Sequence, residues 1–303
     1  MSQHPLLLGA AHLVAFLLLP PLLLGIANKT KAAFAGRVGP PYLQLYFDLV
    51  KLWRKGSVFS STTTWVFKAG PVVALAVALV AGLLVPVGGF APLSFEGDAI
   101  LFAYLFALGR FFTIAAALDT GSAFEGMGSA REATFASLAE PALFFCLLVL
   151  GRLANSLSLS AMLSGADWPP RSAASLVLVM AALFVVLLVE NSRIPFDDPN
   201  THLELTMIHE VMVLDHGGPA LGVILYGASL KLFILAALLV GIAMPAFESP
   251  WLAWGALLTG VAAVAVLIGV VESVMARLRL VHVPSLLVAA CLLSGFGIVL
   301  LAR

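Results

Sequence analysis

Residues 190–216 concentrate ionisable side chains in a stretch that reads ENSRIPFDDPNTHLELTMIHEVMVLDH. Its charged and imidazole groups include Glu190, Arg193, Asp197, Asp198, His202, Glu204, His209, Glu210 and Asp215. Apolar runs long enough to cross a bilayer lie on both sides of it. Carboxylates and imidazoles can take up and release protons, and at membrane depth such groups are unfavourable unless they pair or line a hydrated cavity. The residue types therefore predict a proton pathway or a docking surface.

A second acid, Glu140, precedes Pro141 near the start of an apolar run, and Glu190 closes another such run. Both carboxyls are expected in low-dielectric surroundings, which favour proton exchange near neutral pH. Arg131, Arg193 and Lys231 are available as counter-charges. The alternative interpretation is that each acid is paired with one of these cations only to satisfy its burial.

The composition of the chain indicates that these groups lie in a membrane protein and not in a soluble domain. Hydrophobic residues make up 61% of the chain and charged residues 11%, against roughly 45–50% and about 25% in soluble domains. The mean hydropathy is +1.07. The formal net charge is zero, which gives no electrostatic reason to expect nucleic acid as a partner. The two cysteines lack a CxxC partner or a nearby Cys/His cluster, so we expect buried thiols and no metal site.

Runs of about 20 apolar residues predict one polytopic domain, 1–303, that is all α-helical and has about eight transmembrane helices. The expected spans are 6–26, 69–87, 99–118, 138–156, 173–190, 219–242, 251–271 and 284–302. The first span lacks a preceding basic residue and a cleavage site, so a signal peptide is not expected. Prolines within and beside the spans indicate kinks.

Basic residues predict the orientation in the membrane. The connections after the odd-numbered spans, 27–68, 119–137, 190–218 and 271–283, hold eleven of the 16 Lys and Arg residues. By the positive-inside rule these connections are cytoplasmic and both termini lie outside. The polar segments thus face one side, as a docking platform requires. We expect the inner membrane of a prokaryote as the location.

Within the first connection, residues 42–55 combine two kinds of side chain at helical spacing. Tyr42, Leu45, Tyr46, Leu49 and Leu52 share one side, and Gln44, Asp48, Lys51 and Lys55 share the other. The pattern predicts an amphipathic helix at the membrane interface, opened by a Gly-Pro-Pro turn. It is either a simple surface anchor or part of the platform.

Four segments together resemble one family. They are GRVGPPYLQLYFDLVKL in the first connection, LDTGSAFEGMGSAREATFASLAEP at 118–141, ENSRIPFD at 190–197 and VESVMARLRL at 271–280. They are similar to the membrane subunit shared by respiratory complex I, as its subunit 1, and the group 4 nickel–iron hydrogenases, including formate hydrogenlyase. The SARE stretch before a Glu-Pro pair resembles the hydrogenase branch.

The resemblance implies a membrane subunit without a redox cofactor of its own. Its cytoplasmic loops would seat an iron–sulfur subunit and a large catalytic subunit that carry iron–sulfur clusters and a nickel–iron or quinone site, and antiporter-like membrane subunits would lie beside it. Glu140, Glu190, Asp197 and Glu204 would match the family's coupling acids. Arg37, Asp48, Asp119, Arg131 and Arg193 are expected to order the loops, form ion pairs or contact the docked subunits.

After residue 197 the chain departs from the family, whose acid-rich run is replaced by DPNTHLELTMIHE. If 201–214 is helical, His202 and His209 share one face but lie two turns apart, too far for a tight metal-binding pair. Because histidines titrate near neutral pH, His202 and His209, with Glu210, are candidates for a proton relay. Hydrogen bonding to a docked subunit is the alternative.

Three other functions stay open at this stage. A quinone-reducing complex of the same family would need a roomy amphipathic tunnel. A solitary secondary transporter would be expected to show two related halves, and none is seen. A passive membrane anchor would tolerate the loss of Glu140 and Glu190.

Overall fold

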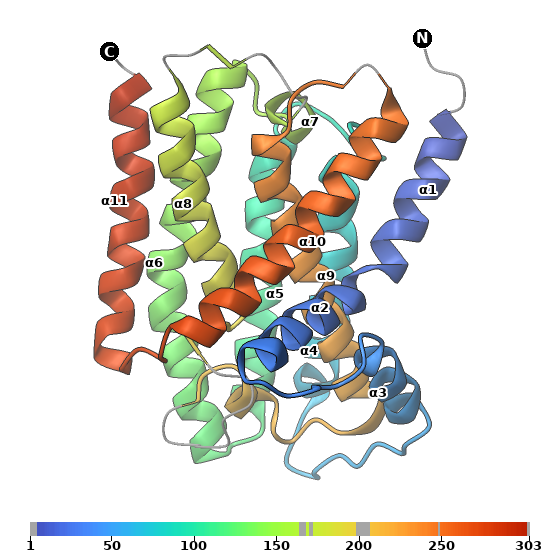
Figure 1. Ribbon diagram of the computed structural model, residues 1–303. Coiled ribbons are helices and arrows are strands. Elements are labelled where there is room, and N and C mark those ends of the chain that lie inside the picture. Colours follow the sequence, from blue (N-terminus) through green and yellow to red (C-terminus); the bar gives the residue numbers. More distant parts are fainter. Residues whose placement is uncertain (1–4, 164–167, 170–171, 198–206, 248, 302–303) are drawn as a thin grey trace.

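The computed structural model describes residues 5–163, 168–169, 172–197, 207–247 and 249–301. Within these residues the regular structure is helical and no strand occurs (Figure 1). The helices are α1 (Pro5–Leu18), α2 (Pro20–Phe34), α3 (Gln44–Trp53), α4 (Trp65–Leu84), α5 (Asp98–Asp119), α6 (Ala123–Ala154), α7 (Leu159–Met162), α8 (Ala173–Glu190), η2 (Glu210–Val213), α9 (Gly218–Ala243), α10 (Pro250–Val274), η3 (Leu280–His282) and α11 (Val283–Leu301).

Seven of these helices are long and apolar enough to cross a membrane, and α1 with α2 makes an eighth span bent by 47°. The bend falls at Pro20 and Pro21, where proline removes backbone N–H groups. Pro71 and Pro141 lie inside α4 and α6. The predicted all-α membrane fold is thereby confirmed. The start of α1 and the end of α11 lie at the same end of the bundle, and the long connections meet at the other, the loop end (Figure 1).

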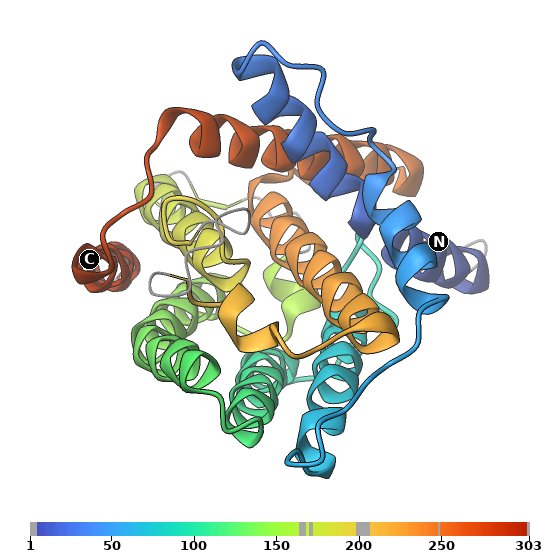
Figure 2. The same cartoon turned by 90° about the horizontal axis from the view of Figure 1, so that it is seen from below.

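Helix α9 is the centre of the bundle, and it packs against α2, α3, α4, α8 and α10 (Figure 2). Most of its side chains are buried, including those of Leu230, Phe233 and Leu235. Small residues allow close approach of neighbouring helices. At Gly70 of α4, for example, an added Cβ would lie 2.6 Å from the Cβ of Ala116 on α5.

The predicted interfacial helix is present as α3, which packs on α9 and α2. Leu49 is its buried residue, and Lys51 on the other side is exposed. The helix begins two residues after the predicted start, because Gly39, Pro40 and Pro41 lead into a turn that ends at Leu43. The apolar side of α3 therefore anchors it to the helical bundle.

Two expectations about the connections are corrected. Residues 123–137, predicted to be part of a loop, form the first turns of α6, which begins at Ala123 and extends beyond the apolar run. These first turns contain polar residues such as Glu125 and Arg131, so they do not belong to an apolar run that would predict a helix. The regular helix considered for 201–214 is absent from its described part: 207–209 are irregular, and the short helix η2 (Glu210–Val213) follows.

Candidate functional site

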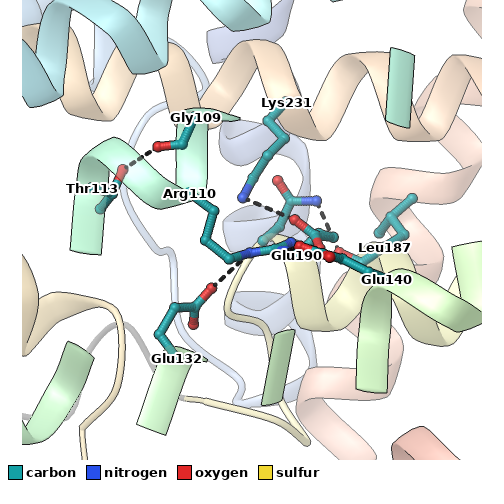
Figure 3. A network of polar contacts seen from close by, with 9 residues as sticks. Gly109, Arg110, Thr113, Glu132, Glu140, Leu187, Glu190 and Lys231 are labelled. Carbon is teal, nitrogen blue, oxygen red and sulfur yellow. Dashed lines mark hydrogen bonds and ion pairs between the residues drawn. The ribbon is translucent and has the colours of Figure 1, made fainter. Parts of the chain in front are cut away.

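The side chain of Arg110 on α5 is the centre of a buried ionic cluster (Figure 3). Its guanidinium nitrogens pair with three carboxylates: Nε lies 3.3 Å from Glu132 Oε1, Nη1 donates to Glu140 Oε1, and Nη2 donates to Glu190 Oε1. Glu132 and Glu140 come from α6, and Glu190 is the last residue of α8. A planar guanidinium can donate to several carboxylates at once, which a lysine cannot do with the same geometry. Arg110 therefore joins three membrane helices.

Helix α9 contributes the fifth charge of this Arg110-centred cluster. Lys231 Nζ lies 3.4 Å from Glu190 Oε2. The side chains of Arg110 and Glu190 are 8% and 5% exposed, whereas that of Glu140 is 39% exposed. Three carboxylates face two cations, so the fully ionised cluster carries one excess negative charge. Since excess charge is strongly disfavoured where water is scarce, the cluster is suited to holding one exchangeable proton.

A cavity of about 130 Å³ lies beside the cluster. At its polar side it is lined by Arg110, Glu132, Glu190 and Lys231, together with His209 and His216. Apolar side chains of α4, α5 and α9 form much of the remaining wall. Burial, together with the nearby charge of Lys231, lowers the pKa of His209 to about 4. His209 is thus a neutral imidazole at pH 7, able both to donate and to accept a hydrogen bond.

The segment that follows α8 fixes His209 at this cavity. Asp197 is 1% exposed, and its Oδ2 accepts the backbone N–H groups of Ile208 at 3.1 Å and of His209 at 3.2 Å. Its Oδ1 lies 2.9 Å from a guanidinium nitrogen of Arg277. The carboxylate thus clamps two stretches of the loop end to each other. Asp197 orders the backbone around His209.

A second ionic group holds the same connection to helices α10 and α2. Arg193 lies 3.3 Å from Glu272, whose side chain is fully buried, and Lys31 lies 2.9 Å from the other oxygen of that carboxylate. Arg193 follows Glu190 by three residues. Residues 190–193 therefore carry Glu190 of the Arg110-centred cluster at one end and Arg193, the partner of Glu272, at the other. This segment connects the Arg110-centred cluster to α10 through ion pairs.

The structure brings together only some of the residues singled out from the sequence. Glu140 and Glu190 meet at Arg110, and Asp197 and His209 lie next to each other at the loop end. Glu210 begins η2. His202 and Glu204 lie outside the described residues.

The candidate docking residues have different surroundings. Arg37 is exposed at the loop end. Arg131 donates to the backbone oxygen of Met207 at 2.8 Å, and Asp48 accepts from Gln44 within α3 at 3.0 Å. Asp119 accepts from the backbone N–H groups of Thr64 at 2.6 Å and Phe67 at 3.2 Å, where it supports the start of α4.

Sequence analysis missed Arg110, Glu132 and Glu272. A single arginine inside the apolar run of α5 was itself a usable signal, because ionisable residues within a span are expected to have a function. Of the proposed counter-charges, Lys231 pairs with Glu190 and Arg193 pairs with Glu272. Nothing in the sequence order indicated these partners.

The described residues contain no group of three or more His, Cys, Asp or Glu side chains arranged to hold a metal ion. Both cysteines are free thiols. Cys146 is buried as expected, whereas Cys291 is half-buried.

Known proteins resemble the chain over nearly its whole length. The sequence model of the NADH dehydrogenase family matches residues 8–302. Formate hydrogenlyase subunit 4 of Escherichia coli (strain K12) is 35% identical over 291 residues, which cover 93% of this chain and 92% of that protein. Hydrogenase-4 component C of the same organism is 32% identical over 282 residues, covering 90% and 89% of the two chains.

The fold also matches a solved structure. A chain in the structure of the membrane-bound sulfane sulfur reductase, an archaeal respiratory membrane complex, superposes with a TM-score of 0.83 at 20% identity, covering 97% of this chain and 98% of that one. At this identity the likeness shows the shared fold. Together with the sequence matches, it identifies the protein as a multi-pass membrane member of the NADH dehydrogenase subunit 1-like family, with relatives in formate hydrogenlyase and hydrogenase-4.

Proposed function

We propose that the protein is a membrane subunit of a multisubunit, hydrogenase-like oxidoreductase related to complex I, and that its Arg110-centred cluster couples electron transfer in partner subunits to proton movement. The observation that carries the proposal is the cluster itself: Arg110, Lys231 and three carboxylates meet inside the membrane helices beside a cavity. The relatives support the hydrogenase-like assignment, because they are subunits of formate hydrogenlyase and hydrogenase-4.

In this proposal the excess carboxylate of the cluster takes up one proton and later releases it. Glu140 is the most exposed of the three acids, and Glu190 contacts both Arg110 and Lys231. A proton bound to Glu190 would weaken its ion pairs with both cations. Proton uptake would therefore alter the contact of α8 with α5 and α9, and a change in this contact would alter proton affinity in return.

The loop end is proposed as the seat of an iron–sulfur subunit and a large catalytic subunit, with antiporter-like subunits alongside in the membrane. The connections that gather there, including the segments before and after α3, are longer than helix joints require. The end with these basic connections would face the cytoplasm, and the ends of α1 and α11 would face outward. Iron–sulfur clusters, and a nickel–iron centre where present, would belong to the docked subunits.

The alternative is a quinone-reducing complex, and the size of the cavity weighs against it. Ligand pockets for molecules of drug size measure roughly 300–1,000 Å³. The cavity of about 130 Å³ is smaller, but it has polar groups at one side and room for a few water molecules, each of which takes about 30 Å³ in the liquid. Water is the occupant that a proton path requires.

The test of coupling uses Glu190→Gln, which keeps the size of the side chain and removes its ability to bind a proton. In the assembled complex in sealed vesicles, we expect electron transfer to an artificial acceptor to persist while protons moved per electron fall. Glu96→Gln is the control, because Glu96 is an exposed carboxylate near the opposite end, where it accepts from Ser156 and Leu157. Undiminished proton movement in well-assembled Glu190→Gln would make the cluster structural and favour a passive anchor.

Docking is tested separately by charge reversal at exposed arginines. Arg37→Glu changes a side chain at the loop end, and Arg152→Glu changes an exposed arginine near the end of α6 on the opposite side. We expect the first variant to release the soluble subunits from washed membranes and the second to retain them. Equal retention in both would contradict a contribution of Arg37 to docking.

A further inference from the structure

The segment between η2 and α9 contributes His216 to the cavity lining, and two buried titratable groups lie along this segment. The carboxylate of Glu125, fully buried near the start of α6, accepts the backbone N–H of Asp215 through Oε1 at 3.1 Å. The next residue, His216, is 6% exposed and stacks on Phe67 of α4 with ring centroids 4.0 Å apart and planes 8° from parallel. Neither side chain belongs to the Arg110-centred cluster.

Each of these two groups has a buried polar atom that no described residue satisfies. Glu125 Oε2 and His216 Nδ1 lack hydrogen-bond partners within the described part of the chain. Buried polar atoms are nearly always hydrogen-bonded, to protein or to ordered water, and an exception calls for an explanation. His216 lines the cavity, and Glu125 accepts a hydrogen bond from the residue before it, so the two unsatisfied atoms point to a place where water and protons are exchanged.

The position of the pair relative to the cluster supports this interpretation. His216 lines the cavity, and so do Glu132 and Glu190 of the cluster. Glu125 precedes Glu132 by seven residues on α6, which is close to two turns and about 10 Å along the same side of the helix. Asp215, beside both groups, is exposed. Glu125 and His216 thus lie between the loop surface, where Asp215 is exposed, and the cavity that borders the cluster.

We propose that Glu125 and His216 form the uptake route by which protons from water at the loop end reach the cavity and the Arg110-centred cluster. The inference rests on the coupling role proposed above and extends it to residues outside the cluster. Water at the loop end would protonate the Glu125 carboxylate. That proton passes, directly or through a water molecule, to one ring nitrogen of His216, while the other nitrogen gives up its proton to water in the cavity.

A carboxylate of the cluster is the final acceptor, so one proton moves inward for each passage and no electron is transferred. Rotation of the ring between passages turns its protonated nitrogen towards the cavity again and its unprotonated nitrogen towards Glu125. Burial lowers the pKa of His216 to about 4, and the charge of Asp215 opposes the shift. The ring is therefore neutral at pH 7, with one donor and one acceptor nitrogen, as such a relay requires.

The experiment measures proton uptake by the assembled complex in sealed vesicles, alongside electron transfer to an artificial acceptor. Glu125→Gln keeps an oxygen for the N–H of Asp215 and cannot bind a proton, and His216→Gln removes the relay. We expect proton uptake to fall by about a hundredfold in each, with electron transfer retained. His282→Gln, at an exposed histidine of the loop end, and Glu96→Gln are the matched controls and should behave like the parent.

A second variant separates a relay from a structural role. Imidazole added to His216→Gly should restore uptake, whereas benzene, which fills the same gap without a nitrogen that binds a proton, should not. Where a glutamine variant does not assemble, Glu125→Asp and the rescued His216→Gly are measured in its place. The uptake route would be overturned if assembled Glu125 and His216 variants took up protons normally while Glu190→Gln did not. The proposed function would still stand in that case. Normal uptake in Glu190→Gln as well would overturn the proposed function itself.

Discussion

Replacement of Arg110 by glutamine is the perturbation to which the structure gives the largest expected effect. Glu132, Glu140 and Glu190 would lose their shared cation, and Lys231, 3.4 Å from Glu190, would be the only cation left in the cluster. Removing one partner of a buried ion pair destabilises by about 3–5 kcal/mol, because the other charge stays buried.

The contributions of the three carboxylates differ with their exposure. Glu190 is 5% exposed, so its pair with Arg110 should account for most of the loss. Glu140 is 39% exposed, and water screens its pair towards the surface value of about 0–1 kcal/mol. We therefore expect Arg110→Gln to lower the free energy of unfolding by about 3–5 kcal/mol, and Arg110→Gln with Glu190→Gln to recover about 1–3 kcal/mol of it.

The assay is thermal unfolding of the purified complex in lipid nanodiscs, with both single variants and the double variant compared as a cycle. Arg152→Gln, at an exposed arginine at the opposite end, is the control and should match the parent. The reasoning is refuted if Arg110→Gln is as stable as the control, or if removing Glu190 in addition makes the protein less stable still. Either result would mean that the pair of Arg110 with Glu190 does not stabilise the folded protein.

Two further predictions concern the loop end. In the folded state the pKa of His216 is about 4, because burial disfavours the charged ring, whereas its ordinary pKa in the unfolded chain is 6.5. Between pH 4 and 6.5 the unfolded state therefore binds more protons than the folded state. Stability should therefore fall as pH drops from 6.5 to 4, by at most about 3 kcal/mol, and His216→Gln should show a smaller fall in its unfolding temperature over this range. Asp119→Ala should lower the unfolding temperature, since the carboxylate caps the start of α4, and Asp119→Asn should retain most of the parent's stability in the same unfolding measurement.

Apolar runs were enough to predict the membrane spans, because the bilayer imposes a length and a composition on each crossing. They failed where a helix extends beyond its apolar run. The first turns of α6 carry Glu125, Arg131 and Glu132, and these turns were assigned to a loop for lack of apolar residues. With that assignment, Glu132 could not be placed at membrane depth. Helix periodicity beyond the apolar run was the signal that could have found it.

The candidate site was only half predictable. Glu140 and Glu190 could be named because acids next to apolar runs are unusual, but their common partner, Arg110, lies 30 and 80 residues away in sequence. Pairing over such separations depends on which helices pack together. A single sequence carries no direct record of that packing. The local sequence likewise allowed a regular helix around His209. In the structure the backbone there is irregular, and Asp197 accepts a hydrogen bond from its N–H.

The order of these partners along the chain matters for how the protein is made. Arg110 enters the membrane within α5 before Glu190 has been synthesised, 80 residues later. At about 5–20 residues per second, the ribosome needs about 4–16 s to close that gap. An arginine near the middle of an inserting helix is disfavoured by about 2.5–3.5 kcal/mol, so the apolar remainder of α5 must favour insertion by more than this. During that interval α5 depends on Glu132 and Glu140, 22 and 30 residues downstream, or on the insertion machinery, to shield its charge.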